Sequence, residues 1–386
     1  MKILILAENI GGTAPGIVFE KLIYGLAKHH EIDVITQLYD PNILQVINNI
    51  KLSKVNNIHV NPRIKKILIS FLGIDPIDLY WSYKVNKYIK IYNICSYDLI
   101  FSFVSSGHYA ALIAGVNSSI IIGCKHISYL VDAIPAPIGW LKNGFYYRGI
   151  KSMMRRYLAR LDAMFSSNQY MLKYQLDMFN LKKNMITGVI NNPNMGSFSK
   201  YSNTENEANV FVYTGGIYGP RKPAFVIDAF IKLLSIYPES KLIFVGTVLP
   251  RDVFYSINDQ DKSKIEIHPF TSDLSYYYSI ATALIDIDCI LEDDVFISSK
   301  IVNYININRI IISETGINSP SRNIFKGIDS ILQCNHDSDE IYEAMKKSIE
   351  LKNTISYDDR KKVQKHFGLE EVVKNLNIEL EKIITI

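Results

Sequence analysis

Short apolar runs alternate with longer amphipathic stretches along the 386-residue chain. The runs are rich in Ile, Val, Leu and Phe, which indicates buried strands, and the longer stretches have the spacing of helices. This alternation predicts an α/β fold with parallel sheets covered by helices on both faces. In the first half we expect strands at residues 2–6, 32–36, 97–103, 119–124, 163–166 and 185–189, and helices up to residue 28, at 108–116 and at 169–179.

The second half repeats the pattern more regularly. Strands are expected near Val210, Lys241, Ile265, Ala283, Arg309 and Ser330, and helices near Ala224, Asp252, Asp273, Ser299 and Asp337 and at residues 357–366 and 369–383. Between the halves, residues 188–209 lose their apolar periodicity and collect Asn, Ser, Pro and Glu, which is typical of a hinge. We therefore expect one domain at residues 1–192 and a second at residues 205–368.

Each half contains a glycine-rich turn between a strand and a helix. The later turn carries Gly215-Gly216 and is followed by Arg221 and Lys222, and the earlier turn carries Gly11-Gly12. Free N–H groups at a helix N-terminus bind anions, and glycine lets a phosphate approach the backbone closely. The pattern predicts tandem nucleotide-type domains, with a nucleotide diphosphate at the later turn.

Composition narrows the class of protein. An apolar content of 48% with 21% charged residues predicts a globular chain with two cores, and a formal charge of +4 is too small to indicate nucleic acid. The cysteines form no Cys-x-x-Cys pair, which argues against a zinc site or a disulfide framework and favours a reducing cytoplasm. Glu8 and Asn9 cut short the apolar start, and no run reaches the roughly 18 apolar residues of a membrane span.

Three strings together resemble GT-B glycosyltransferases, in particular the large retaining family GT4. They are residues 213–223, the Phe-Val-Gly ending at Gly246, and residues 296–304 with the strand that follows; Gly11-Gly12, residues 160–168 and residues 191–193 fall in the expected order. The resemblance covers nearly the whole chain. It implies two Rossmann-like domains facing each other across a cleft, with the acceptor held by the first domain, the donor by the second, and the terminal helix, residues 369–386, crossing back to the first.

The resemblance also implies a reaction and a set of site residues. A sugar would pass from a nucleotide-diphosphate donor to a saccharide or lipid-linked acceptor, with retention, in cell-surface polysaccharide biosynthesis. The departing diphosphate needs fixed positive groups, and Arg221 and Lys300 are the catalytic candidates; a helix-end or helix-surface charge is the alternative for each. The expected donor-binding set is Gly12, Gly215, Gly216, Lys222, Gly246, Phe270, Ser298, Ser299 and Asn303.

This sequence departs from the family pattern at three positions. Relatives often carry two glutamates with seven residues between them, and Val295 and Asn303 stand there instead. Asp132 matches the carboxylate of a His-Asp pair at a strand end, whereas Val131 replaces the histidine. Asp132 is the third catalytic candidate, either accepting a hydrogen bond from an acceptor hydroxyl or only capping a loop.

We expect neither a metal nor a cofactor besides the donor. Asp286 and Asp288 reproduce an Asp-x-Asp pattern that holds a divalent metal in other glycosyltransferases, but they end an apolar strand, which favours coincidence. GT-B enzymes generally stabilise the leaving group with helix termini and basic side chains.

Residues 133–161 form a basic and aromatic segment that allows two interpretations. Residues 133–161 carry six Lys or Arg and no acid, interleaved with aromatic and Met side chains. Residues 140–160 could rest on anionic lipid at the inner face of the membrane, or form a solvent-facing helix packed on the sheet. Two alternatives to the transferase also stay open: a sugar-nucleotide 2-epimerase of the same fold, and a nucleotide-sugar-binding protein without catalysis.

Overall fold

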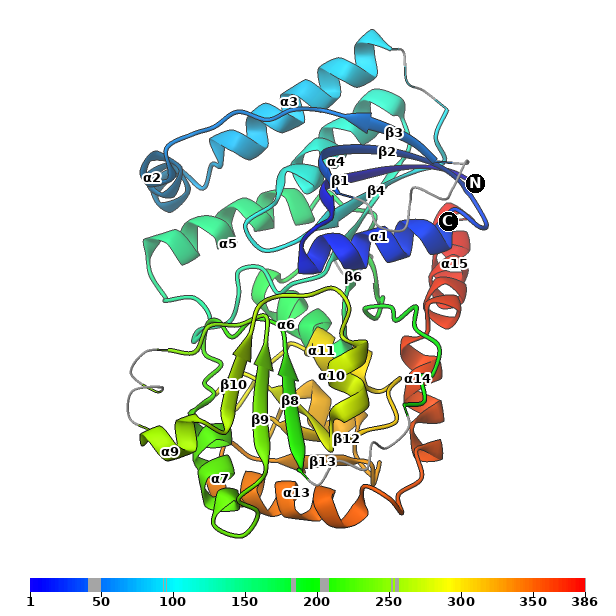
Figure 1. Ribbon diagram of the computed structural model, residues 1–386. Coiled ribbons are helices and arrows are strands. Elements are labelled where there is room, and N and C mark those ends of the chain that lie inside the picture. Colours follow the sequence, from blue (N-terminus) through cyan, green and yellow to red (C-terminus); the bar gives the residue numbers. More distant parts are fainter. Residues whose placement is uncertain are drawn as a thin grey trace. The chain divides into compact units, whose positions relative to one another are not determined.

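The computed structural model describes residues 1–40, 50–92, 94, 96–181, 185–201, 208–250, 253 and 257–385, and it divides into two α/β units (Figure 1). The first unit comprises Met1–Met195 and Phe367–Ile386, and the second comprises Gly196–His366. The predicted helix near Asp252, Cys95 and hinge residues 202–207 lie outside the described residues.

The first unit is built on a seven-stranded sheet in the order β3-β2-β1-β4-β5-β6-β7, and every neighbouring pair is parallel. Helices cover both faces, which explains why β1, β4, β5 and β6 are buried along almost their whole length. Its strands are β1 (Lys2–Gly11), β2 (Glu31–Asp40), β3 (Ile50–Lys54), β4 (Leu99–Val104), β5 (Lys125–Leu130), β6 (Ala163–Ser166) and β7 (Ile186–Val189). Its helices are α1 (Ala14–Leu26), α2 (Pro62–Leu72), α3 (Pro76–Ile91), α4 (Ala110–Ile122), α5 (Phe145–Leu158), α6 (Gln169–Phe179) and α15 (Leu369–Thr385).

The second unit is built on a six-stranded parallel sheet in the order β10-β9-β8-β11-β12-β13. Its strands are β8 (Val210–Thr214), β9 (Lys241–Val245), β10 (Ile265–His268), β11 (Ala283–Ile287), β12 (Ile310–Glu314) and β13 (Ile331–Cys334). Its helical segments are α7 (Ala224–Leu234), α9 (Asp259–Lys262), α10 (Ser275–Ile280), α11 (Ser299–Tyr304), α12 (Pro320–Ile324), α13 (Ser338–Leu351), the 3₁₀ turn η2 (Asp358–Arg360) and α14 (Lys361–Phe367). The six strands predicted for this half are confirmed.

The terminal helix α15 completes the core of the first unit. Leu376 and Leu380 are buried in the same cluster as the strands of that sheet, and a Cβ atom on Gly25 of α1 would lie 2.4 Å from Val373 Cγ2. His30 Nε2 also hydrogen-bonds Asn377 Oδ1 at 2.9 Å. The expected return of the terminal helix to the first domain is confirmed.

One predicted strand is wrong. Residues 119–124 include the end of α4, which closes at Gly123 with a φ of +80°, and the next strand begins at Lys125. The run Ile120–Ile122 has strand composition, but helix α4 is apolar on all sides, so its periodicity is flat and the two structures are hard to distinguish. Among the described helices, none combines the length and the apolar content needed to traverse a bilayer.

Candidate functional site

Several of the predicted site residues lie where the strand order of the second sheet reverses. That point lies between β8 and β11, and the corresponding point of the first sheet lies between β1 and β4. In open α/β sheets, ligands bind outside the carboxyl ends of the strands at such a point. Gly215 follows β8 directly, and Asp286 lies in β11.

The turn after β8 is fixed by hydrogen bonds on both sides. The N–H of Gly215 donates to the carbonyl of Val245 at 2.7 Å. The N–H of Thr214 donates to the hydroxyl of Tyr304 at 3.0 Å. Gly215 has a φ of +93°, in the left-handed region that favours glycine. A rigid glycine turn is therefore present at the predicted position.

Lys300 lies against this turn. Ser298 caps helix α11 by accepting from the N–H of Lys300 at 3.3 Å, and its hydroxyl donates to Asp286 Oδ1 at 2.6 Å. The Lys300 ammonium lies 5.2 Å from the centroid of the Tyr213 ring, and a Cβ atom on Gly215 would lie 3.0 Å from Lys300 Cε. The cap sets the start of the helix, and the missing side chain of Gly215 leaves room for the lysine.

Burial and neighbouring charges shift the pKa of Lys300. Burial, reinforced by the nearby Arg221, lowers the pKa of Lys300 to about 8, while Asp286 and Asp288 oppose the shift. Burial also raises the pKa of Asp286, against the stabilising effect of Lys300 and the Ser298 hydrogen bond. An ammonium that is costly to hold without an anion is well suited to bind one.

Arg221 lies deeper than Lys300. Only 7% of Arg221 is exposed, and its guanidinium lies 4.9 Å from the centroid of the Tyr218 ring. Its backbone forms an isolated antiparallel bridge with Cys289, just beyond β11. Burial alone would lower the pKa of Arg221, but Tyr218 and Asp288 outweigh it and raise the pKa. Arg221 thus adds positive charge close to Lys300, although it does not line the pocket to which Lys300 contributes.

One pocket of about 160 Å³ brings three predicted donor-binding residues, Gly215, Phe270 and Asn303, together with the catalytic candidate Lys300. Thr214, Tyr278 and Tyr304 complete part of its wall. Phe270 is 80% exposed, and a Cβ atom on Gly246 would lie 3.4 Å from its ring, so Gly246 belongs to the same locality. Ser298 is buried and does not line the pocket, but it contacts Lys300 through the helix cap. Gly216, Lys222 and Ser299 are exposed, and none of the three is among the residues that line this pocket.

A larger cavity of about 880 Å³ lies elsewhere in the second unit, beside β13 and α13. Its lining includes no predicted site residue and carries more carboxylates than ammonium groups: Asp329, Asp339, Glu340, Glu343 and Glu350 against Lys346 and Lys347. An acidic wall repels a diphosphate. The smaller pocket at the strand reversal is therefore the better candidate for an anionic ligand.

The two remaining predicted residues, Gly12 and Asp132, belong to the first unit. Gly12 has a φ of +61° and lies in the turn before α1. Asp132 accepts from the N–H of Ser106 at 2.9 Å. It therefore caps a loop, which was the alternative role considered for it in the sequence analysis. Burial raises the pKa of Asp132, with the Ser106 hydrogen bond and His108 opposing.

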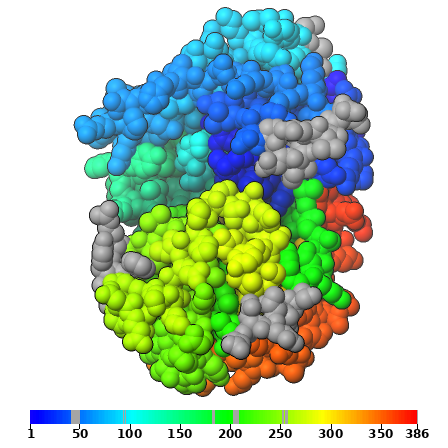
Figure 2. Space-filling view, viewed as in Figure 1, coloured from blue at the N-terminus to red at the C-terminus, as the bar shows by residue number. Residues whose placement is uncertain are grey.

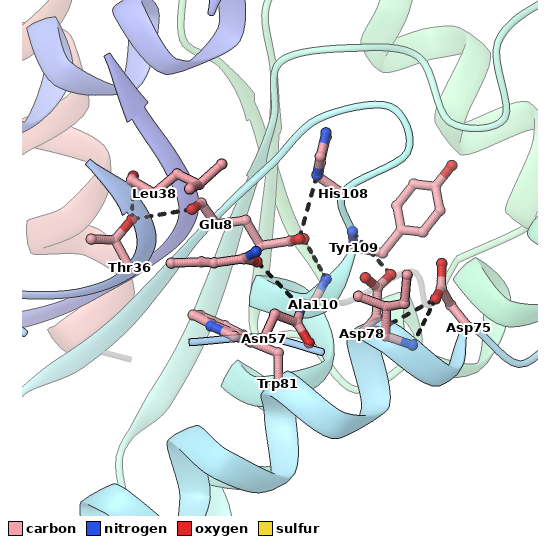
Figure 3. A network of polar contacts seen from close by, with 12 residues as sticks. Glu8, Thr36, Leu38, Asn57, Asp75, Asp78, Trp81, His108, Tyr109 and Ala110 are labelled. Carbon is pink, nitrogen blue, oxygen red and sulfur yellow. Dashed lines mark hydrogen bonds and ion pairs between the residues drawn. The ribbon is translucent and has the colours of Figure 1, made fainter. Parts of the chain in front are cut away.

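Next to Asp132, the first sheet carries a polar network that the sequence did not predict (Figure 3). Glu8, 5% exposed, accepts from the N–H of Ala110 at the start of α4 at 2.9 Å, and its second oxygen lies 3.4 Å from His108 Nδ1. The hydrogen bond to Glu8 raises the pKa of His108, against the opposing effect of burial. Nearby, buried Asp78 accepts from the N–H of Tyr109 at 3.2 Å. The carboxyl ends of β1, β4 and β5 thus present Glu8, His108 and Asp132 together.

One signal for this network was visible in the sequence. Glu8 interrupts an otherwise apolar strand, and a carboxylate at such a position needs a partner when it is buried. The partner itself was hidden, because His108 is 100 residues away and meets Glu8 only through the pairing of β1 with β4.

The structure offers one cluster for a metal among the described residues. Ligand atoms of Asp288, Cys289 and Asp294, all buried, lie within 4.8 Å of one another. The charge of Arg221 acts on Asp288 and disfavours a second cation there. Asp286, the other member of the Asp-x-Asp pattern, hydrogen-bonds Ser298 instead. That no metal is needed stays a prediction.

No protein-family model and no curated protein sequence matches the chain, but solved structures match its fold. Anabaena HepE in complex with UDP and glucose is 14% identical, covers 99% of each chain and gives a TM-score of 0.69. WaaG, a glycosyltransferase involved in lipopolysaccharide biosynthesis, is 11% identical over 97% of this chain and 98% of its own, with a TM-score of 0.66. A Listeria monocytogenes protein described as a candidate UDP-N-acetylglucosamine 2-epimerase is 11% identical over 99% and 96%, with a TM-score of 0.59.

The chain has the GT-B fold. Its two parallel α/β units match these structures along nearly the whole length of the chain. At sequence identities of 11% and 14%, the likeness to these structures shows the fold alone. Activity has to be argued from the residues of this chain.

Proposed function

We propose that the protein is a glycosyltransferase that moves a sugar from a nucleotide-diphosphate donor to a saccharide or lipid-linked acceptor. The observation that carries this proposal is the position of Lys300, which lies in a pocket at the strand reversal of the second sheet, against the glycine turn and within electrostatic reach of the buried Arg221. Cleavage of the donor places negative charge on the departing diphosphate, and fixed cations stabilise that charge without reorganising.

We assign the acceptor to the first unit. Glu8, His108 and Asp132 offer two carboxyls and an imidazole at one sheet edge, which suits hydrogen bonding to sugar hydroxyls. HepE was solved with UDP and glucose, and WaaG acts in lipopolysaccharide biosynthesis, which supports a uridine donor and a cell-surface glycan as the first substrates to test. Membership of GT4 and retention of anomeric configuration rest on the sequence resemblance.

The test measures release of nucleoside diphosphate from a set of nucleotide sugars, with and without acceptor glycans or lipid extracts. Wild-type protein should show acceptor-dependent turnover with at least one donor. Lys300→Ala should lower kcat/KM about 100-fold or more, the usual loss for a group that stabilises developing charge. Lys326→Ala, which removes an exposed lysine of the same unit, is the matched control and should retain activity.

The same assay separates the two alternatives. An epimerase, which the Listeria structure makes a concrete candidate, would convert the nucleotide sugar with no acceptor present. A binding protein without catalysis would retain nucleotide affinity and turn nothing over, an outcome consistent with the absence of a carboxylate at Val295 and Asn303. Unchanged nucleotide affinity in Lys300→Ala would overturn the proposed donor site itself.

A further inference from the structure

Helix α2 of the first unit exposes an apolar face. Ile64, Ile67 and Phe71 follow one another at helical spacing and are 53%, 56% and 70% exposed, and the adjoining Leu72 is 57% exposed. Ile69 is the one residue of this helix that is buried. In Figure 2 the blue atoms of this part of the chain reach the left-hand edge of the first unit.

The helix is held firmly in this orientation. It crosses α5 so closely that a Cβ atom on Gly149 would lie 1.8 Å from the carbonyl oxygen of Ile69. An ion pair of 2.8 Å joins Lys65 to Asp75, which is fully buried and caps α3. The buried side of α2 is therefore occupied by α5 and by this ion pair, and the apolar face is what remains outside.

Helix α5 extends the face with one aromatic ring and a row of cations. Phe145, 65% exposed, stacks on Phe71 with ring centroids 5.7 Å apart and an interplanar angle of 23°. Arg148, Arg155 and Arg156 follow on the exposed side of α5. Exposed apolar side chains bordered by guanidinium groups are thus combined on two packed helices. We call this surface the α2–α5 face.

Charge is distributed unevenly along the chain. Residues 59–74 and 133–161 carry nine of the 42 Lys and Arg residues and no acid, whereas the remaining 33 basic residues are outnumbered by 38 acidic ones. The segments that build the α2–α5 face are therefore positive in a protein whose remainder is negative. A partner for this face must accept apolar side chains and carry negative charge.

We propose that the α2–α5 face docks on a membrane that contains anionic lipid. Apolar side chains enter the acyl boundary while Lys and Arg meet the headgroups, and the interfacial helix lies parallel to the surface. A second copy of the chain is disfavoured, since two such positive faces repel each other. Nucleic acid would match the charge but would leave the apolar residues exposed.

This assignment revises the membrane face expected from residues 140–160. Met153 and Met154 are buried in the core of the first unit, and Trp140, Tyr146 and Tyr147 are only partly exposed. Phe145 and the arginines of α5 remain outside, and the apolar contribution comes from α2. The proposal is independent of sugar transfer, because docking needs neither donor nor acceptor.

The experiment is co-sedimentation of the full chain with vesicles of phosphatidylcholine alone and with added phosphatidylglycerol, over a range of salt. Wild-type protein should bind only the anionic vesicles, and binding should weaken as salt rises. Arg148→Glu with Arg155→Glu should reduce vesicle affinity roughly 30-fold or more. Ile67→Ser with Phe71→Ser should reduce it about tenfold or more. Their matched controls, in the second unit, are Lys326→Glu with Lys347→Glu and Ile236→Ser with Ile317→Ser.

Two further measurements keep the proposal falsifiable if a variant is unstable. Phe71→Trp should give a blue-shifted emission with anionic vesicles that brominated lipid quenches, whereas Ile236→Trp should not. Molar mass from light scattering tests whether a second copy of the chain covers the α2–α5 face instead. Absence of vesicle binding, equal binding by the α2–α5 variants and their controls, or a wild-type dimer that Phe71→Ser converts to monomer would each overturn the proposal.

Discussion

A Cβ atom built on Gly215 lies 3.0 Å from Cε of Lys300, so the glycine turn and the lysine occupy adjoining space. Gly215→Ala would force an L side chain into a φ of +93° and push the lysine away from the pocket. The backbone strain alone is about 1–3 kcal/mol. We expect UDP affinity, measured by titration calorimetry, to fall by about tenfold or more.

Gly216→Ala is the matched control. Gly216 is not among the positive-φ glycines, and an added Cβ atom would meet Tyr218 Cδ1 at an ordinary 3.6 Å. Affinity should change little in this variant. Equal losses in both variants would show that the turn as a whole, and not the Gly215–Lys300 contact, controls binding.

Binding of UDP should depend on pH through Lys300. Its pKa of about 8 in the free protein means that the ammonium is present at pH 7 and is lost as the pH rises through 8. The terminal phosphate of a nucleoside diphosphate is already ionised in this range, so it does not offset the change. Affinity should therefore fall above pH 8, by up to about tenfold per pH unit.

Lys300→Arg distinguishes charge from other causes of this pH dependence. Arginine stays protonated throughout the range, so the variant should bind UDP with a flat profile between pH 7 and about 8.5. A profile in Lys300→Arg as steep as that of the wild type would assign the titration to another group.

The second unit could be predicted from local patterns because five of its six strands are short runs that are buried almost throughout, β10 being the exception. The first unit was harder. Helix α4 has apolar residues on every side, which concealed the end of the helix at Gly123. Helices α2 and α3 were missed although their starts carry clear signals, Asn61-Pro62 and Asp75-Pro76, with the Asn and Asp side chains capping and proline in the first turn.

The candidate site residues show the same difference between local and long-range information. Gly215 and Lys300 were found because each lies in a recognisable string. Glu8 and His108 were not found as a pair, because the pairing of Ala7 with Phe103 in adjacent strands brings their segments together. Sequence motifs locate the residues of one turn, and sheet register decides which distant residues they meet.

The cap of helix α11 gives a direct test of local stability. Ser298→Ala removes both the cap of the Lys300 N–H and the hydrogen bond to the buried Asp286. We expect the free energy of unfolding to fall by about 1–3 kcal/mol, measured by urea denaturation. The neighbouring Ser299 is exposed, and Ser299→Ala should change stability by less than about 0.5 kcal/mol. Similar values for the two variants would exclude the cap as the cause.

The pairing of Glu8 with His108 predicts a change that NMR can follow. Glu8→Gln keeps an oxygen for the N–H of Ala110 but removes the charge that raises the pKa of His108, so that pKa should fall. A raised histidine pKa stabilises the fold at pH values below the unfolded pKa and loses this effect as the pH rises through the folded pKa. The stability gap between wild type and Glu8→Gln should therefore narrow at higher pH. Glu31→Gln, at a surface acid paired with Lys2, should leave the His108 titration unchanged.

The contact between Gly25 and α15 tests whether the returning helix is part of the first core. A Cβ atom at Gly25 would lie 2.4 Å from Val373 Cγ2 and 3.1 Å from Leu369 Cδ1. Replacing a helical glycine with alanine gains about 1 kcal/mol, but overpacking costs about 1–3 kcal/mol, so Gly25→Ala should be net destabilising in urea denaturation. Val373→Ala makes room for the added methyl group, so the double variant should be more stable than the sum of the single changes predicts. Gly144→Ala, where nothing lies within 4 Å of the added atom, should show no such coupling to Val373→Ala. Additive effects of Gly25→Ala and Val373→Ala would mean that α15 does not pack on α1 in solution.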